Sequence, residues 1–281
     1  MRTRFITFKV TMFYLATKSP LRSKLRVIIW FLYRLFLRLI LDFKRMKARI
    51  KHVEDQIIES KMKDGAVFLN TIEQLSNLYE IYCKERDEKI KWKLPINPII
   101  VDVGSHIGIY SIRKAIEYPS GLIYSIEPEK KNFEMLKRNI KLNNLKNVIP
   151  INIALFDREG HMKLYLDNFG SGQHTLIKKA KRSYKLVKVT TLKNLVRKIK
   201  PPSIDLIKID TEGAEYPIIL GGVSILRKFK PFLIIETHPW NDKNCDKKIL
   251  KLLKRLGYAA KLVKYDGPAK YEGSVIFAWQ K

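Results

Sequence analysis

Acidic side chains and one histidine follow two short, largely apolar runs in the C-terminal part of this 281-residue chain. The run at 206–209 leads into Asp210, and Glu212 and Glu215 come soon after it. A second run, farther along, leads into His238. Carboxylates and imidazoles can accept protons or bind metal ions, and an acid after a strand can also begin the next helix. We therefore take Asp210, Glu212 and His238 as the candidate catalytic residues, and we leave open which is the general base and whether a metal ion is needed.

A glycine-containing segment near residue 100 has the composition of a nucleotide-binding loop. The β-branched residues 99–101 lead into an acid and two glycines, and a helical pattern follows. Glycine lets the backbone approach a ligand, and the free N–H groups of a helix N-terminus can face it. Because a histidine replaces the middle glycine of the dinucleotide pattern G-x-G-x-x-G, the loop suits an adenosine-type cofactor without a pyrophosphate better than it suits NAD. The residues expected to contact this cofactor are Asp102, Gly104, Ser105, His106 and Gly108.

Residues after the next two predicted strands extend this cofactor site. Glu127 lies 25 positions after Asp102, a separation that suits one strand–helix–strand unit. A carboxylate there can accept hydrogen bonds from both ribose hydroxyl groups of a nucleoside; the alternatives are a helix cap or a solvated loop acid. Ala154 and Asp157 follow the third strand, where they would form a wall against adenine or an ordinary loop.

The chain from residue 98 onward alternates strand and helix patterns. We predict strands at 99–103, 122–126, 148–153, 206–209, 232–236, 259–263 and 274–278. We predict helices at 109–117, 129–143, 191–198, 217–228 and 245–256, and extra paired strands at 162–166 and 187–189. Repeated units of this kind form a mainly parallel sheet with helices on both faces. The last two strands are joined by a Gly-Pro turn without a helix, which makes the final strand antiparallel.

The chain between residues 98 and 278 resembles the FkbM family of S-adenosylmethionine-dependent methyltransferases. The resemblance rests on motifs in the family's order: VDVGSHIG at 101–108, IALFD at 153–157 with Glu159-Gly160, GSG at 170–172, VTTL at 189–192, IKIDTEGAE at 207–215 with Gly221-Gly222, and the segment 231–238. Lys193 stands where the family usually has an aspartate. The resemblance implies a class I methyltransferase fold, which is an α/β, Rossmann-like, seven-stranded sheet. It also implies S-adenosyl-L-methionine as cofactor and methyl transfer to oxygen, often on sugars, glycans or secondary metabolites.

The N-terminal region has a different composition. Residues 27–41 are nearly all apolar, except that Arg34 and Arg38 lie on one helical stripe with further basic residues. This pattern is typical of a helix that lies on a membrane, and we expect residues 22–49 to contact an anionic membrane surface. A helix packed on the catalytic domain or on a second subunit is the alternative. Spanning is disfavoured because a bilayer needs about 20 apolar residues without internal arginines.

Bulk composition completes the prediction. The net charge of +28 favours anionic partners, or else reflects a lysine-rich proteome. Two distant cysteines suggest neither a zinc site nor a disulfide framework, which fits a reducing compartment. Together with the N-terminal helix pattern, this leads us to expect a cytoplasmic protein that is peripheral at the inner face of the membrane. We divide the chain into a basic helical segment (1–63), a helical connector (64–97) and a methyltransferase domain (98–281).

Three functions follow in order of preference. The first is O-methylation of a small-molecule or glycan hydroxyl acceptor. The second is RNA methylation, which the positive charge favours. Against it, the sequence has neither the Pro-Pro motif of amino-methylating enzymes after the fourth strand nor a cysteine where a nucleophile would stand. The third is a non-catalytic module that tethers partners, which the acidic cluster argues against. The sequence assigns no oligomeric state.

Overall fold

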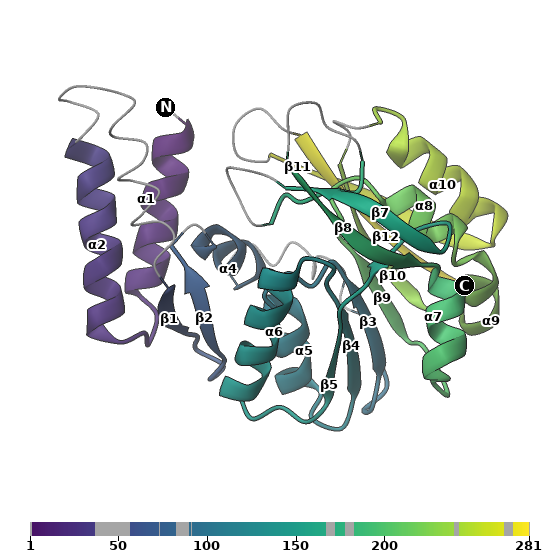
Figure 1. Ribbon diagram of the computed structural model, residues 1–281, viewed down its shortest axis with the longest axis horizontal. Coiled ribbons are helices and arrows are strands. Elements are labelled where there is room, and N and C mark those ends of the chain that lie inside the picture. The colour runs from purple at the N-terminus through teal and green to yellow at the C-terminus, as the bar shows by residue number, and fades with distance from the viewer. Residues whose placement is uncertain are drawn as a thin grey trace.

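The computed structural model describes residues 2–36, 57–72, 74–82, 90, 92–166, 172–177, 183–238, 242–266 and 272–280. Its centre is a seven-stranded sheet in the order β11-β12-β10-β9-β3-β4-β5 (Figure 1). The strands are β3 (Ile99–Val103), β4 (Leu122–Ile126), β5 (Val148–Ile151), β9 (Leu206–Ile209), β10 (Phe232–Thr237), β11 (Tyr258–Asp266) and β12 (Glu272–Gln280). Neighbouring strands are parallel except that β12 runs antiparallel to β10 and β11. The predicted fold class and the antiparallel final strand are confirmed.

Helices cover both faces of this sheet. One face carries α5 (Ile109–Glu117) and α6 (Lys130–Leu142), and the other carries α7 (Leu192–Ile199), α8 (Glu215–Leu220), α9 (Val223–Phe229) and α10 (Cys245–Arg255) (Figure 1). Alternating residues of β3 face the two sides: Ile100 packs in the core beneath α5 and α6, whereas Val101 and Val103 pack in the core beneath α7 to α10. Burial on both faces explains why β3 is apolar at successive positions.

The helix expected at 217–228 is two helices with a break at Gly221-Gly222. A Cβ atom on Gly221 would lie 2.5 Å from the Phe156 carbonyl oxygen, and one on Gly222 would lie 2.6 Å from Leu192 Cδ2. These contacts bring the end of α8 against α7 and the loop after β6 (Ala154–Leu155). The glycine pair therefore ends one helix and begins the next because the backbone must pass close to its neighbours.

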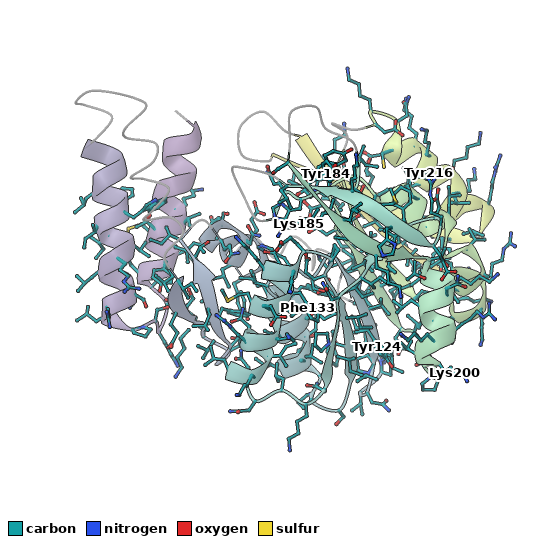
Figure 2. All side chains as sticks on the ribbon, viewed as in Figure 1. Tyr124, Phe133, Tyr184, Lys185, Lys200 and Tyr216 are labelled. Atoms are coloured by element: carbon teal, nitrogen blue, oxygen red, sulfur yellow. The ribbon has the colours of Figure 1, made fainter. Side chains whose placement is uncertain are left out.

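A second, three-stranded sheet lies beside the ligand-binding end of the domain. Its order is β6-β8-β7, with β7 at Gly160–Tyr165 and β8 at Tyr184–Thr190. Strands β7 and β8 are antiparallel, which confirms the extra strand pair predicted between residues 157 and 190. Lys185, labelled in Figure 2, extends from β8 to Glu129 in the loop after β4, with 2.6 Å between Nζ and Oε1. The small sheet is thus tied to the main one across the cofactor side.

The region before β3 differs from the prediction. It holds α1 (Arg2–Leu15), α2 (Leu21–Phe36), a hairpin of β1 (Ile57–Lys61) and β2 (Val67–Thr71), and α4 (Leu75–Tyr82). The expected boundary between residues 63 and 64 falls in the turn of this hairpin, so neither the expected helical segment (1–63) nor the expected helical connector (64–97) is helical throughout. On either side of the turn at Asp64-Gly65, buried and less buried residues alternate along each strand. This period of two is typical of strands, but over five residues it is hard to tell from a helical pattern.

Asn139 of α6 and Asn143, the residue that caps the C-terminal end of α6, fix the hairpin to the catalytic domain. The Asn139 amide accepts from Leu69 N at 2.7 Å and donates to Leu69 O at 3.2 Å. The Asn143 amide bonds Val67 in the same way, at 2.7 and 2.6 Å. Because these residues lie one turn apart on α6, they match alternate residues of β2. The hairpin, and α4 after it, is therefore held at a defined position beside the site.

Helix α2 packs on α1 and β1 with one side and exposes apolar residues on another. Val27 is fully buried and Trp30 is buried, while the Ser23 hydroxyl accepts from Glu59 N at 3.3 Å. An exposed apolar stripe, which we call the α2 stripe, consists of Leu21, Leu25, Ile29 and Leu32. Residues 37–56, which hold most of the predicted basic stripe, lie outside the described residues. Among the residues that the structure does describe, none of the helices has the length and hydrophobicity to cross a bilayer.

Candidate active site

Two adjoining pockets open at the carboxyl ends of the central strands. The apolar slot is lined mainly by aliphatic side chains, with a glutamate at its edge: Val103, Ile126, Glu127, Ile153, Ala154, Leu155, Leu164 and Leu176. The acidic pocket next to it is rich in carboxylates: Glu80, Asp102, Asp210, Glu212 and Glu236. Gly104, His106, Gly172, Asp210 and Glu212 line both pockets and so lie where the two meet. Ligands of open α/β sheets bind at this end of the strands.

Gly104 allows the tips of β3 and β9 to approach each other. Its φ of +83° lies in the left-handed region, and a Cβ atom on it would overlap the carbonyl oxygen of Asp210. The Asp210 amide in turn donates to Val103 O at 3.0 Å. The glycine therefore sets the position of the candidate catalytic acid as well as the shape of the cofactor loop.

Asp102, Ser105 and Gly108 build the frame of the loop. Asp102 is fully buried, and its Oδ2 accepts from the Ser111 hydroxyl at 2.6 Å. The Ser105 hydroxyl donates to the backbone carbonyls of Asp102 and Ile126, at 3.0 and 3.1 Å. A Cβ atom on Gly108 would overlap Leu136 of α6, so this glycine serves the packing of α5 on α6. Asp102 and Ser105 line the acidic pocket, whereas Gly108 lines neither pocket.

Glu127 joins the loops that follow β3 and β4. One carboxylate oxygen accepts from His106 N at 2.9 Å, and the other accepts from Glu129 N at 2.9 Å. Burial raises the pKa of Glu127 to about 7, although both backbone hydrogen bonds oppose this shift. Glu127 therefore changes charge near neutral pH at the edge of the apolar slot.

His106 lies between the two pockets with a φ of 53°. Burial, together with the nearby His174, lowers the pKa of His106 to about 4, so its ring is neutral at pH 7. The Asn77 amide lies 3.3 Å from its Nδ1, and the Gln74 amide lies 3.4 Å from its Nε2. Asn77 lies in the first turn of α4, and Gln74 directly precedes that helix. The N-terminal end of α4 therefore closes one side of the site.

His238 is buried among four carboxylates. Its Nδ1 lies 2.8 Å from Glu215 Oε1, and its Nε2 lies 3.6 Å from Glu212 Oε1 and 3.8 Å from both Asp210 Oδ1 and Glu236 Oε1. Burial alone would lower the pKa of His238, but Glu212, Glu215 and Glu236 outweigh it and raise the pKa to about 10. A base must be unprotonated at working pH, so among the three candidate catalytic residues this arrangement disfavours His238 as the general base.

The structure brings together most of the predicted site residues. Asp102, Gly104, Ser105, His106, Glu127, Ala154, Asp210, Glu212 and His238 all line one or both pockets. Asp157 does not: it is exposed and pairs with Arg158, with 2.8 Å between Oδ1 and Nε. Ala154 and Leu155 form β6 of the second sheet and line the slot, whereas Asp157 lies in the turn between β6 and β7.

Several residues that line the acidic pocket were not predicted from the sequence to have a role there. Lys208 is buried in β9, and its Nζ lies 3.2 Å from Asp210 Oδ2. Glu236 accepts a hydrogen bond from the Tyr265 hydroxyl. A lysine within an otherwise aliphatic strand was a signal that could have found Lys208, since buried lysines are paired. Asn77 carried no such signal, because its place depends on how α4 docks.

The fold and the two pockets define a class I methyltransferase. Consistent with this, residues 102–260, more than half of the chain, match the sequence-family model described as the Methyltransferase FkbM domain. The chain therefore belongs to the FkbM family of S-adenosylmethionine-dependent methyltransferases, as its motifs predicted.

Individual relatives agree with this assignment. Methyltransferase sdnD of Sordaria araneosa is 27% identical over 197 residues, which cover 59% of this chain and 75% of that protein. Methyltransferase 1 of Beauveria bassiana (strain ARSEF 2860) is 25% identical over 152 residues, covering 45% of this chain and 59% of that protein. A crystal structure of methyltransferase FkbM from Methylobacillus flagellatus KT shares the fold with a TM-score of 0.51 at 13% identity, covering 89% of this chain and 59% of that chain.

Proposed function

We propose that this methyltransferase transfers a methyl group to a hydroxyl group of a sugar, glycan or secondary metabolite. The observation that carries the proposal is the position of Asp210 and Glu212, which line both pockets. A hydroxyl acceptor in the acidic pocket would meet these carboxylates at the junction with the apolar slot. Carboxylates at that point can orient the hydroxyl group and take its proton.

The residues of the apolar slot fit the adenosine part of S-adenosylmethionine. Aliphatic side chains such as Ala154 and Leu155 provide a surface for adenine, and the Glu127 carboxylate at the edge can accept hydrogen bonds from ribose. The bound cofactor supplies a methyl group already activated by its sulfonium charge. The protein then has to align the acceptor oxygen with that methyl group and receive the hydroxyl proton, and we assign the second task to Asp210 or Glu212.

A panel of acceptor classes tests the proposal. The full chain is incubated with S-adenosylmethionine carrying a tritiated methyl group and, separately, with mono- and oligosaccharides, hydroxylated small metabolites, RNA and protein. We expect label on a hydroxylated acceptor in an ether linkage that survives mild base. Label in RNA alone would instead favour the RNA alternative, and cofactor binding without transfer to any class would favour a tethering module.

We expect cofactor affinity to rise with pH through the titration of Glu127. Below its pKa of about 7 the carboxyl group holds a proton and loses acceptor capacity; above that pKa both oxygens can accept from ribose. Glu127→Gln should weaken binding at pH 8 by roughly 10- to 100-fold, the worth of hydrogen bonds to a charged group, and should flatten the profile. Calorimetric titration with S-adenosylmethionine between pH 6 and 8 measures this.

Glu129 provides the control for this profile. Burial would raise its pKa, but Lys185 and the Asn132 amide outweigh burial and lower it, so Glu129 stays ionised across that range. Glu129→Gln should therefore keep the slope that Glu127→Gln removes. A wild-type affinity that is constant from pH 6 to 8 would rule out Glu127 as the titrating ribose acceptor.

We also propose that the α2 stripe contacts an anionic membrane surface. The stripe is accompanied on α2 by Arg22, Lys24 and Arg26, a combination typical of interfacial helices. The double variant Leu25→Glu, Ile29→Glu should bind anionic vesicles at least about tenfold less in co-sedimentation at low salt, because each side chain contributes roughly 1.5–3 kcal/mol when it leaves water. Ile96→Glu, at an exposed apolar residue far along the chain, is the matched control. Equal vesicle binding by all three proteins would contradict the proposal.

A further inference from the structure

Asp210, Glu236 and His238 converge on one point at the base of the acidic pocket. Ligand atoms of these three residues all lie within 4.8 Å of one another, and Glu236 and His238 are buried. From His238 Nε2 to the facing oxygens of Asp210 and Glu236 the separation is 3.8 Å in each case, and to Glu212 Oε1 it is 3.6 Å. Hydrogen bonds between nitrogen and oxygen are shorter than this.

The separations match those between neighbouring ligands of one metal ion. Protein nitrogen and oxygen atoms lie about 2.0–2.2 Å from a small divalent cation, so two ligands of the same ion are about 3–4 Å apart. All three separations from His238 Nε2 fall within that interval. The ligand atoms of Asp210, Glu236 and His238, all within 4.8 Å of one another, are thus close enough to bind one cation.

Glu215 holds the imidazole in the orientation that a metal ligand requires. Its Oε1 lies 2.8 Å from His238 Nδ1 and also accepts from Gly213 N at 2.9 Å. When a cation takes the place of the proton on Nε2, a ring that donates Nδ1–H to this carboxylate directs its Nε2 lone pair toward Asp210 and Glu236. Metal-bound histidines almost always donate their other N–H group in this way. Glu215 itself is fully buried, and within the described residues its Oε2 makes no hydrogen bond.

The local charge also calls for a cation. Four carboxylates, from Asp210, Glu212, Glu215 and Glu236, surround the ring. Lys208 Nζ lies 3.2 Å from Asp210 Oδ2, and Asp210 Oδ1 lies on the side of His238. Lys208 and the protonated ring offset part of the repulsion among these buried carboxylates, and a dication bound in place of the ring proton would offset more of it.

We propose that Asp210, Glu236 and His238 bind a divalent cation of the Mn²⁺ or Mg²⁺ type, with Glu212 beside it to receive the hydroxyl proton. Oxygen ligands with one imidazole suit Mn²⁺, while a site of carboxylates and waters also suits Mg²⁺. The ion would bind the acceptor hydroxyl group and lower its pKa, a role that rests on the O-methylation proposed above. The cation site itself does not depend on that function.

Mn²⁺ binding to the chelator-treated full chain tests the site without any acceptor. We expect one Mn²⁺ per chain by electron paramagnetic resonance, and a rise in the melting temperature on adding Mn²⁺ because the ion binds only the folded state. Asp210→Asn and Glu236→Gln should each weaken binding at least about tenfold, and the positioning variant Glu215→Gln by about 10- to 100-fold. Glu134→Gln, at an exposed helix residue paired with Lys137, should bind as the wild type does.

The outcomes separate the cation site from the proposed reaction. S-adenosylmethionine affinity, measured on each variant, shows that the fold is retained. No stoichiometric Mn²⁺ binding by the wild type, or binding that the Asp210 and Glu236 variants leave unchanged, would overturn the site even if methyl transfer to a hydroxyl acceptor is found. Conversely, Mn²⁺ binding that the Asp210, Glu236 and Glu215 variants weaken and that Glu134→Gln leaves unchanged would support the site, whatever acceptor class the enzyme uses.

Discussion

Replacing Gly104 with alanine is expected to destabilise the domain by more than about 4 kcal/mol, an unusually large effect for one methyl group. The new Cβ atom would overlap the Asp210 carbonyl oxygen, so the tips of β3 and β9 would have to separate. These strands lie at the centre of the sheet and are packed on both faces, which leaves little room to relax. Equilibrium unfolding in urea, followed by circular dichroism, measures the loss.

Gly257→Ala is the matched control. Gly257 has a φ of +80°, almost the same as the +83° of Gly104, but no atom lies within 4 Å of the position a Cβ atom would take. Its replacement should cost only the left-handed backbone strain, about 1–2 kcal/mol. The difference between the two variants therefore isolates the collision. Equal losses would show that Gly104 is needed only for its backbone conformation.

Asp210→Asn is expected to lower kcat for methyl transfer about 10²- to 10⁴-fold, which is the usual contribution of a positioned general base. Asparagine keeps the size of the side chain and an oxygen that can accept from Lys208, which lies 3.2 Å away. It cannot take a proton from the acceptor. Single-turnover transfer to the acceptor found in the panel measures the effect. The dissociation constant of S-adenosylmethionine should change little, because asparagine has the same size and the aliphatic residues of the slot are unchanged.

Glu212→Gln distinguishes the two candidate proton acceptors. Glu212 also lines both pockets, and it is held with a φ of 57°, a conformation that non-glycine residues adopt mainly where the surroundings impose it. The residue that acts as base should show the larger loss of kcat and should remove the acidic limb of the pH–rate profile. Wild-type kcat in both variants would refute the assignment of the base to this pair.

Much of the candidate cofactor site could be predicted from the sequence. The loop after β3, Glu127 after β4 and Asp210 after β9 each lie at the end of a strand that its own residues identify. Because parallel strands end at the same edge of the sheet, predicting the strands was enough to bring these residues together. The prediction differed from the structure across the boundary between the expected helical segment (1–63) and the expected helical connector (64–97), where residues 57–71 form a hairpin. Asp157 follows β6 yet lines neither pocket, because it lies in the turn between β6 and β7 of the second sheet.

The sequence by itself determined the family, the fold class and the strand ends that carry the chemistry, because those signals are local runs of residues. Only the tertiary structure decided which side chains meet. Lys208 and Glu236 join Asp210 and His238 because β9 and β10 lie side by side in register, and Asn77 reaches His106 because α6 holds the hairpin before α4. The charge state of His238 likewise depends on carboxylates from several segments, since a pKa reflects what surrounds a group in space rather than what adjoins it in the chain.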